Sequence, residues 1–192
     1  MPVTEVDVVV VGAGTAGANA AAQLARRGRS VVLLERRAVD DGGAQWCNGV
    51  LDRQFVRAGL EPPSGAERVD EHGDVHLRTA ADEAAVVVRA SPVVGVDMAR
   101  LGARLRADAA AAGVEVVDRA GDLEVAEVDG RIRAVSIERS GGRRRFEAAL
   151  FVDASGRRGV LRDRSTVLRS WCPPVDDADV CTATDVEFAV AD

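Results

Sequence analysis

The feature that most constrains the fold is a glycine-rich turn between two apolar runs, the second of which ends in an acid. Residues 8–17 read V-V-V-V-G-A-G-T-A-G, and residues 31–35 read V-V-L-L-E. In a strand–turn–helix unit, Gly12 permits the tight turn, and Gly14 leaves room for a pyrophosphate at the backbone. Gly17 lets the helix lie close to the strand. The pattern therefore predicts a βαβ unit whose turn binds a dinucleotide.

The residues around the turn support this interpretation over the alternative of a tight turn without a ligand. An alanine-rich helix is expected from Ala18 to Arg27, closed by Gly28. Its N-terminus would offer unpaired N–H groups and a positive dipole end to phosphates. Glu35, at the end of the second strand, is placed to accept hydrogen bonds from ribose hydroxyls.

Length, charge and hydropathy limit the number of domains and the partners that the chain is expected to have. A chain of 192 residues suits one domain or part of a larger two-domain enzyme. The net charge is −6 and the arginines are scattered, so nucleic acid is not an expected partner. The first strand begins almost at the N-terminus, and the longest apolar stretch is too short to span a membrane. These features predict a cytoplasmic protein without a membrane span.

The cysteines and histidines do not predict a metal site or a disulfide framework. The cysteines are odd in number and lack C-x-x-C spacing: Cys47, Cys172 and Cys181. His72 and His76 are four residues apart but have a glycine between them, which favours two solvated histidines over a metal pair.

Weaker patterns follow the second strand. The expected elements are a glycine-rich connection at 38–50, a short helix at 52–59, a polar loop at 61–73, and weak strands at 75–78 and 84–89. A stronger helix is predicted from about residue 97 to 112, with a third parallel strand at 114–117.

Three short alternating runs then predict an antiparallel meander. They cover residues 123–128, 132–138 and 144–149, and they are joined by the two-residue turn signals Asp129-Gly130 and Gly141-Gly142. Residues 150–153 read as another buried parallel strand. The predicted fold class is α/β, with a doubly wound, Rossmann-like parallel sheet and a three-stranded meander crossover.

These motifs resemble the N-terminal part of FAD-dependent oxidoreductases. The resemblance is carried by the glycine turn, the Glu35-Arg36 pair, the meander and F-V-D-A-S-G at 151–156. The chain is most similar to the glutathione-reductase-like branch, which includes geranylgeranyl reductases and flavin monooxygenases. The resemblance implies FAD as cofactor, a small organic substrate, and NAD(P)H as one candidate electron donor.

The resemblance also implies which residues contact the cofactor. Glu35 would hold the adenosine ribose with Arg36 beside it, and the backbone of Val125 would pair with the adenine edge. The pyrophosphate would lie along the turn, and the returning chain would pass near the dinucleotide: Gly12, Ala13, Gly14, Thr15, Ala16 and Gly17, then Ala154, Ser155 and Gly156. The alternatives are a merely solvated Arg36 and an ordinary loop at 154–156.

Two departures from the family pattern affect the expected domain organisation. The family's arginine near the start of the helix at 97–112 aligns with Met98, and Arg100 lies two residues on. The family's second flavin motif, a G-D sequence with small residues, does not occur before Asp192. We therefore expect residues 1–160 to form the FAD-binding domain and residues 161–192 to begin an incomplete second region, so that the chain is an N-terminal portion.

No catalytic residue is assigned, because flavin enzymes rely on the isoalloxazine for the chemistry. Trp46, Cys47 and Asn48 are candidates to face the flavin, against the alternatives of packing for Trp46 and a buried small hydrophobe for Cys47. Two functions remain open: an FAD-binding oxidoreductase, and a non-catalytic or NAD-binding dinucleotide module. The Glu35-Arg36 pair and the meander favour the first.

Overall fold

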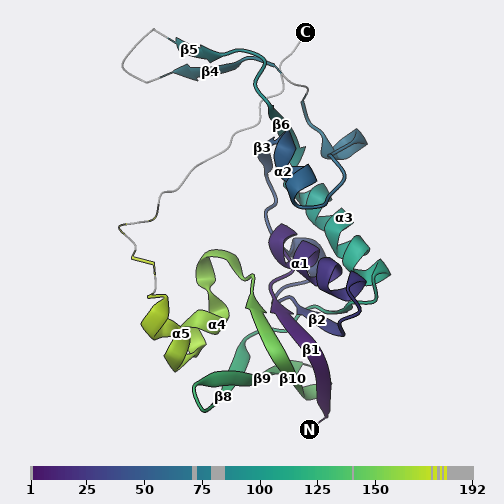
Figure 1. The fold of residues 1–192 in the computed structure, drawn as a ribbon, viewed down its shortest axis with the longest axis vertical. Helices are drawn as coiled ribbons and strands as arrows, with labels where there is room; N and C mark the ends of the chain where they lie inside the picture. The colour runs from purple at the N-terminus through teal and green to yellow at the C-terminus, as the bar shows by residue number, and fades with distance from the viewer. Residues whose placement is uncertain are drawn as a thin grey trace. The chain divides into compact units, whose positions relative to one another are not determined.

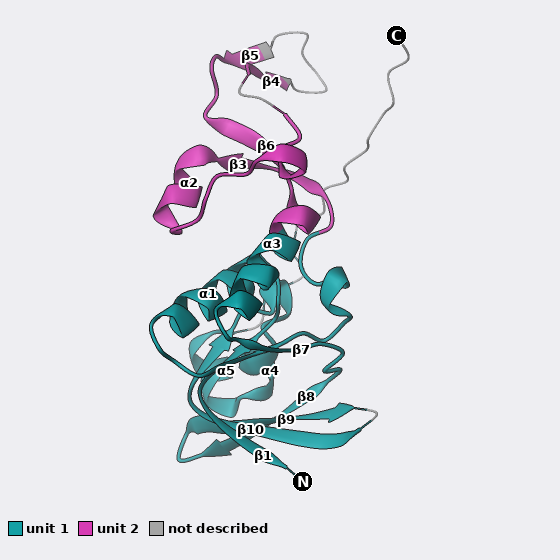
Figure 2. Cartoon of the chain, turned by 90° about the vertical axis from the view of Figure 1, so that its right-hand side faces the viewer, with its two compact units in different colours: residues 1–44, 102–192 teal, residues 45–101 magenta. Residues whose placement is uncertain are grey.

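The structure, a computed structural model, describes residues 2–70, 73–78, 85–139 and 141–173, together with 175, 176, 178 and 180. The chain divides into two compact units (Figure 2). Unit 1 comprises residues 1–44 and 102–192, and unit 2 comprises residues 45–101.

Unit 1 is built on a six-stranded sheet with the order β7-β2-β1-β10-β9-β8 (Figure 1). Its strands are β1 (Val3–Val11), β2 (Val31–Leu34), β7 (Glu115–Val117), β8 (Leu123–Val128), β9 (Arg131–Arg139) and β10 (Gly142–Asp153). The pairs β7–β2, β2–β1 and β1–β10 are parallel, whereas β10–β9 and β9–β8 are antiparallel. The fold is therefore mixed α/β with a largely parallel centre.

The central strands are buried on both faces, as is usual for parallel strands. All residues of Val8–Val11 and of Val31–Leu34 are buried. Because side chains alternate along a strand, Val9 and Val11 share a face. These two residues pack into one apolar cluster with Phe146 and Leu161. Helix α1 (Thr15–Arg26) contacts both β1 and β2, and its buried residues are small.

The first βαβ unit matches its sequence prediction closely. The helix begins at Thr15, three residues earlier than expected, because Gly14 is already its N-cap residue. It ends at Arg26, followed by Gly28 with a φ of +78°. The expected third parallel strand is confirmed as β7, which pairs with β2 through Val32 and Glu115.

The last strand of the sheet corrects the sequence prediction. Residues 144–149 and 150–153 were expected to be separate strands, but both belong to β10. Gly142 pairs with Arg139, so it starts β10 rather than completing the turn. The β9–β10 register ends at Glu147, while the β1–β10 register continues to Asp153. Leu150 lies beyond the end of the β9 pairing and is 49% exposed, whereas this strand was predicted to be buried.

The other helical segments of unit 1 are short, apart from most of α3 (Met98–Ala111), whose first four residues belong to unit 2. They are the 3-10 turns η1 (Val39–Asp41) and η3 (Gly156–Arg158), and the helices α4 (Val160–Arg164) and α5 (Thr166–Trp171). Helix α4 packs against β8 and β10.

Unit 2 contains two antiparallel strand pairs. The first joins β3 (Cys47–Leu51) to β6 (Val93–Asp97), and the second joins β4 (Val75–Arg78) to β5 (Ala85–Val88). Helix α2 (Asp52–Arg57) and the 3-10 turn η2 (Gly65–Glu67) lie between β3 and β4 in the chain. The weak strands expected at 75–78 and 84–89 are confirmed as β4 and β5.

The sequence prediction missed the β3–β6 pair and assigned residues 38–50 to a connection. Each strand has a glycine at its centre, and Gly49 lies directly opposite Gly95. Glycine weakens a strand pattern, so the signal was lost. Close neighbours explain why glycine is present: a Cβ on Gly49 would lie 2.8 Å from Val93, and one on Gly95 would lie 2.7 Å from the Asp70 carboxylate.

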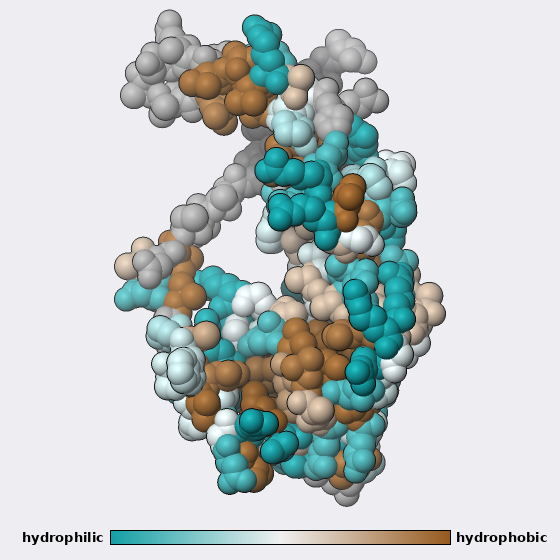
Figure 3. Space-filling view, in the orientation of Figure 1, coloured by the Kyte–Doolittle hydropathy of each residue, from teal (hydrophilic) through white to brown (hydrophobic). Residues whose placement is uncertain are grey.

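The β4–β5 hairpin presents exposed aliphatic side chains (Figure 3). Val75 pairs with Val88, and Leu77 pairs with Val86, so these four residues share one face of the hairpin. Their exposed fractions range from 37% for Val75 to 66% for Val86.

Several sequence expectations concern features outside these elements. Among the described residues, we find no grouping of three or more histidines, cysteines or acids that could hold a metal ion. His76 lies on β4, whereas His72 and Cys181 fall outside the described residues. No described helix is both long enough and apolar enough to cross a lipid bilayer.

A carboxylate on β8 fixes the start of α5 and makes stability depend on pH. The hydroxyl of Ser165, and then that of Thr166 at 2.6 Å, donates to Glu127 and holds its pKa below the usual 4.5. This contribution to stability is complete above pH 4.5 and is lost as the pH falls through the lowered pKa. We expect Glu127→Gln to destabilise the protein at pH 7, with the difference from wild type shrinking toward about pH 3.

Urea unfolding of wild type and Glu127→Gln across this pH range checks the prediction. Glu138→Gln is the matched control, because Glu138 is an exposed glutamate on the neighbouring strand β9. A difference between wild type and Glu127→Gln that stays constant from pH 7 to pH 3 would contradict the assigned role of the ionised carboxylate.

Candidate functional site

A cavity of about 910 Å³ lies in unit 1 at the carboxyl ends of the parallel strands β1, β2 and β10. Ligands of open α/β sheets bind at this edge, where the loops diverge from the strand ends. The lining comes from four segments: residues 11–16 without Ala13, residues 34–37 with 43–44, residues 120–123, and residues 154–175 in part.

The three glycines of the turn have different structural roles. Gly12 has a φ of +101°, and a Cβ on it would lie 2.4 Å from the carbonyl oxygen of Ala154. A Cβ on Gly17 would lie 1.9 Å from the carbonyl oxygen of Gly12. Packing of the protein itself therefore requires glycine at both positions. A Cβ on Gly14 would meet only the Cα of Gly43, at 3.4 Å, so the fold alone does not require Gly14.

Gly14 and Gly43 form a cradle on the cavity wall. Both residues line the cavity, and a Cβ on Gly43 would in turn lie 3.1 Å from the Cα of Gly14. Two glycines, which have no side chains, thus face the space together. Such a surface fits a pyrophosphate, which binds by approaching backbone N–H groups closely.

Glu35 is held in place beside this cradle. It is 7% exposed, and its Oε2 accepts a hydrogen bond from the N–H of Ala13 at 2.9 Å. Its Oε1 accepts from the N–H of Arg37 at 3.1 Å. Because each carboxylate oxygen can accept more than one hydrogen bond, both oxygens keep capacity for a ligand's hydroxyls. The carboxylate is thereby held in place at the cavity and can still accept hydrogen bonds from a ligand.

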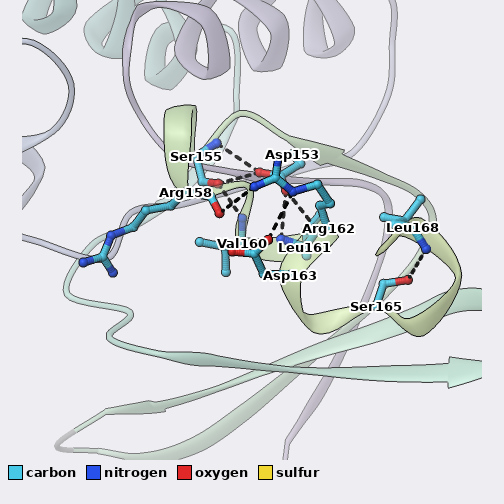
Figure 4. Close-up of polar contacts among 9 residues, drawn as sticks. All are labelled: Asp153, Ser155, Arg158, Val160, Leu161, Arg162, Asp163, Ser165 and Leu168. Atoms are coloured by element: carbon cyan, nitrogen blue, oxygen red, sulfur yellow. Dashed lines mark hydrogen bonds and ion pairs between the residues drawn. The ribbon is translucent and has the colours of Figure 1, made fainter. Parts of the chain in front are cut away.

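The opposite wall is organised by Asp153, at the end of β10 (Figure 4). Its Oδ1 accepts from the hydroxyl of Ser155 at 2.5 Å, and its Oδ2 accepts from the N–H groups of Leu161 and Arg162 at 2.8 and 3.1 Å. The Ser155 hydroxyl oxygen accepts from the N–H of Val160 at 2.8 Å. The network closes residues 154–159 into a fixed loop and caps α4.

Arginines dominate the charge of the cavity wall. The arginines that line it are Arg36, Arg37, Arg157, Arg158, Arg162, Arg164 and Arg169, and the lining acids are Glu35, Asp122 and Asp163. Some of these charges are paired, since Arg162 contacts Asp163 and Arg164 contacts Asp122. The remaining excess is positive, so the cavity favours an anionic ligand even though the whole chain is acidic.

The structure brings most of the sequence-predicted site residues to this cavity. The predicted residues in its lining are Gly12, Gly14, Thr15, Ala16, Glu35, Arg36, Ala154, Ser155 and Gly156. Ala13 and Gly17 are buried behind the wall and support it. Val125 is not in the lining, because it lies farther along β8, paired with Val135. The wall is completed instead by residues 120–123.

The other predicted candidates lie in unit 2. Trp46 is 58% exposed, and Cys47 and Asn48 lie on β3. Roles of these three residues toward a flavin stay predictions. Arg100, which lies two residues after Met98, is exposed and pairs with Asp97 at 3.1 Å.

Asp153 and the arginines of residues 157–169 were not among the predicted site residues. For Asp153 a signal existed, since an acid at the end of a strand preceded S-G and could close the following loop. The arginines gave no such signal, because only the fold gathers them around one cavity.

The turn, its acid and the anion-favouring cavity define a dinucleotide-binding α/β protein. The model of a family described as FAD dependent oxidoreductase matches residues 7–162. The chain belongs to this family, as its sequence motifs had predicted, and FAD is the cofactor.

Two curated relatives illustrate the similarity. The chain is 31% identical over 194 aligned positions to digeranylgeranylglycerophospholipid reductase 2 of Methanothermobacter thermautotrophicus, covering 97% of this chain and 47% of that protein. It is 48% identical over 52 residues to thiamine thiazole synthase of Desulfosudis oleivorans, covering 27% and 20% respectively. The chain thus spans less than half the length of these relatives.

Solved structures share the fold. A geranylgeranyl bacteriochlorophyll reductase-like protein from Thermoplasma acidophilum superposes with a TM-score of 0.73 at 18% identity, over 81% of this chain and 40% of that one. The anhydrotetracycline hydroxylase of Streptomyces rimosus superposes with a TM-score of 0.64 at 23% identity, over 83% and 33%.

Proposed function

We propose that the cavity of unit 1 binds the ADP half of FAD and that the chain serves an oxidoreductase acting on a small organic substrate. The observation that carries this proposal is the cradle of Gly14 and Gly43 beside the fixed carboxylate of Glu35. A pyrophosphate and a ribose are adjacent groups in ADP, and each fits one of these neighbouring features.

The residues of the site would divide the binding between them. The N-terminus of the twelve-residue helix α1 begins at Thr15 and would face the pyrophosphate with its N–H groups. Glu35 would accept hydrogen bonds from the ribose hydroxyls. The lining arginines would lower the cost of placing a dianion in the cavity. When bound, FAD supplies the capacity to accept and donate electrons.

Several finer features belong to the same proposal. Residues 1–160 are the FAD-binding domain with a doubly wound sheet, a boundary supported by the family match over residues 7–162. The names of the reductase relatives favour an apolar organic substrate. NAD(P)H is the candidate electron donor that the family resemblance implies. The family match weighs against an NAD-binding or non-catalytic module.

Titration of the purified chain with FAD, ADP and NAD(H) tests the proposal. Binding of FAD is followed by the quenching of its fluorescence, and ADP is tested by competition. We expect ADP to displace FAD and NAD(H) to bind more weakly than FAD. Tighter binding of NAD(H) than of FAD would overturn the assignment.

Glu35 should also discriminate against a 2′-phosphate. Its buried carboxylate would repel that group by an amount on the order of 1 kcal/mol or more at 4 Å, so NADPH should bind weakly. Glu35→Gln keeps an acceptor for the N–H of Ala13 but removes the charge. We expect this variant to bind FAD about tenfold more weakly and to narrow the preference for FAD over NADPH.

The matched control is Glu5→Gln, since Glu5 is exposed on β1, outside the cavity lining. Strong NADPH binding by the wild type that disappears in Arg36→Ala would contradict the prediction. In that case Arg36 would be the residue that binds the 2′-phosphate.

A further inference from the structure

One buried arginine lies directly behind the wall that carries the glycine cradle. Arg106, on α3, is only 6% exposed. Its Nη1 donates to the carbonyl oxygen of Gly42 at 3.1 Å and to that of Ala13 at 3.4 Å. Gly102, one turn earlier on α3, leaves room for this contact, because a Cβ there would lie 3.0 Å from Nη1.

The two carbonyls bound by Arg106 belong to the peptide groups that precede Gly14 and Gly43. No peptide bond in the described part of the chain is cis, so the C=O and N–H of each peptide point in opposite directions. With both carbonyls directed at Arg106, the N–H groups of Gly14 and Gly43 point away from it. Gly14 and Gly43 line the large cavity, whereas Ala13, Gly42 and Arg106 do not.

These two N–H groups are available to a ligand. Neither donates a hydrogen bond to an acceptor within the described residues. A hydrogen bond from a charged guanidinium to a carbonyl polarises the peptide, which makes the N–H on its other side a better donor. Arg106 therefore makes the N–H groups of both glycines better hydrogen-bond donors.

The charge of Arg106 lacks a carboxylate partner among the described residues. Within the described chain it forms no ion pair, and its interactions are the two carbonyl contacts. A buried cation without a counter-charge is costly, and nearby negative charge relieves that cost. An anion in the cradle in front of Gly14 and Gly43 would supply it.

We propose that Arg106 is a positioning residue that orients the N–H groups of Gly14 and Gly43 as a paired donor site for the pyrophosphate of the bound nucleotide. This inference rests on the proposed function, in which the cavity holds the ADP half of FAD. Arg106 would strengthen phosphate binding without contacting the phosphates. Gly43 would be a second backbone donor beside the glycine turn.

Replacing Arg106 by methionine tests the proposal. Arg106→Met keeps a long apolar side chain but removes the donors and the charge. We expect its affinity for ADP to fall about 10- to 100-fold and its affinity for adenosine, which lacks phosphate, to change less than about twofold. Arg100→Met is the control on the same helix, because Arg100 is exposed and contacts neither carbonyl.

Amide NMR gives a second readout, which is whether the N–H groups of Gly14 and Gly43 respond to Arg106 and to the phosphates. In the free protein, Arg106→Met should shift the N–H signals of Gly14 and Gly43, and Arg100→Met should leave them in place. In the wild type, ADP should shift both glycine signals, whereas adenosine should not shift Gly43.

The outcomes distinguish a positioning role of Arg106 from a merely structural one. Equal losses of ADP and adenosine affinity in a folded Arg106→Met protein would reduce Arg106 to a structural role and overturn the inference, as would unchanged ADP affinity. A Gly43 signal that ignores ADP in the wild type would overturn it even if the variant does not fold. A wild type that binds neither FAD nor ADP would instead refute the proposed function.

Discussion

Replacing Gly14 by valine is expected to weaken FAD binding at least about 100-fold, equivalent to roughly 2.7 kcal/mol. Gly14 has φ −69° and ψ −178°, which any residue adopts, and a Cβ there contacts only the Cα of Gly43 at 3.4 Å. The added methyl groups would press on Gly43 and displace the two glycine backbones that form the cradle, which the pyrophosphate is proposed to contact. Flavin fluorescence titration measures the loss.

A milder variant separates this steric effect from damage to the fold. Gly14→Ala should unfold with a free energy within about 1 kcal/mol of wild type, as expected for a change at an N-cap glycine. It should still bind FAD more weakly than wild type. Wild-type affinity in Gly14→Val would show that the nucleotide phosphates lie elsewhere.

Gly17→Ala is expected to have the opposite signature, a large loss of stability. A Cβ at this position would lie 1.9 Å from the carbonyl oxygen of Gly12 and 3.0 Å from the Cβ of Ala154. Helix α1 must then move away from β1 and β10. The expected cost is about 3 kcal/mol or more, which lowers Tm by roughly 6–12 °C.

Thermal unfolding of Gly17→Ala beside Gly141→Ala measures this effect. Gly141 lies in an exposed turn, and a Cβ on it would meet no atom within 4 Å. The control should therefore unfold near the wild-type temperature. If Gly17→Ala and Gly141→Ala have the same Tm, the close approach of helix and turn does not exist in solution.

Much of unit 1 could be predicted because its signals are local. The four-valine run before Gly12 and the V-V-L-L run before Glu35 specify adjacent buried strands, and the glycines specify the turn between β1 and α1. The β3–β6 pair could not be found in this way. Its central glycines are explained by contacts with Val93 and Asp70, which a local pattern cannot reveal.

In the candidate site, too, the residues of a local motif could be predicted, and those brought in by tertiary packing could not. Gly14 and Glu35 belong to one short motif, so sequence spacing sufficed to place them together. Gly43 and Arg106 reach the same wall only through tertiary packing, from a loop after β2 and from α3. For Val125 the expected strand exists as β8. Which residue of that strand meets the cavity, however, depends on where β8 begins.

The parallel pairing of β1 with β10 has a consequence for how the protein is made. β1 is synthesised first, yet its partners on one side extend to Asp153, which pairs with Val11. At ordinary rates of translation, roughly 7–30 s separate the synthesis of these two residues. During that interval the edge of a four-valine strand lacks its partner, and such edges readily pair with other chains. The nascent chain is therefore most exposed to misassembly before β10 leaves the ribosome, and its yield will depend on chaperones that cover β1 until then.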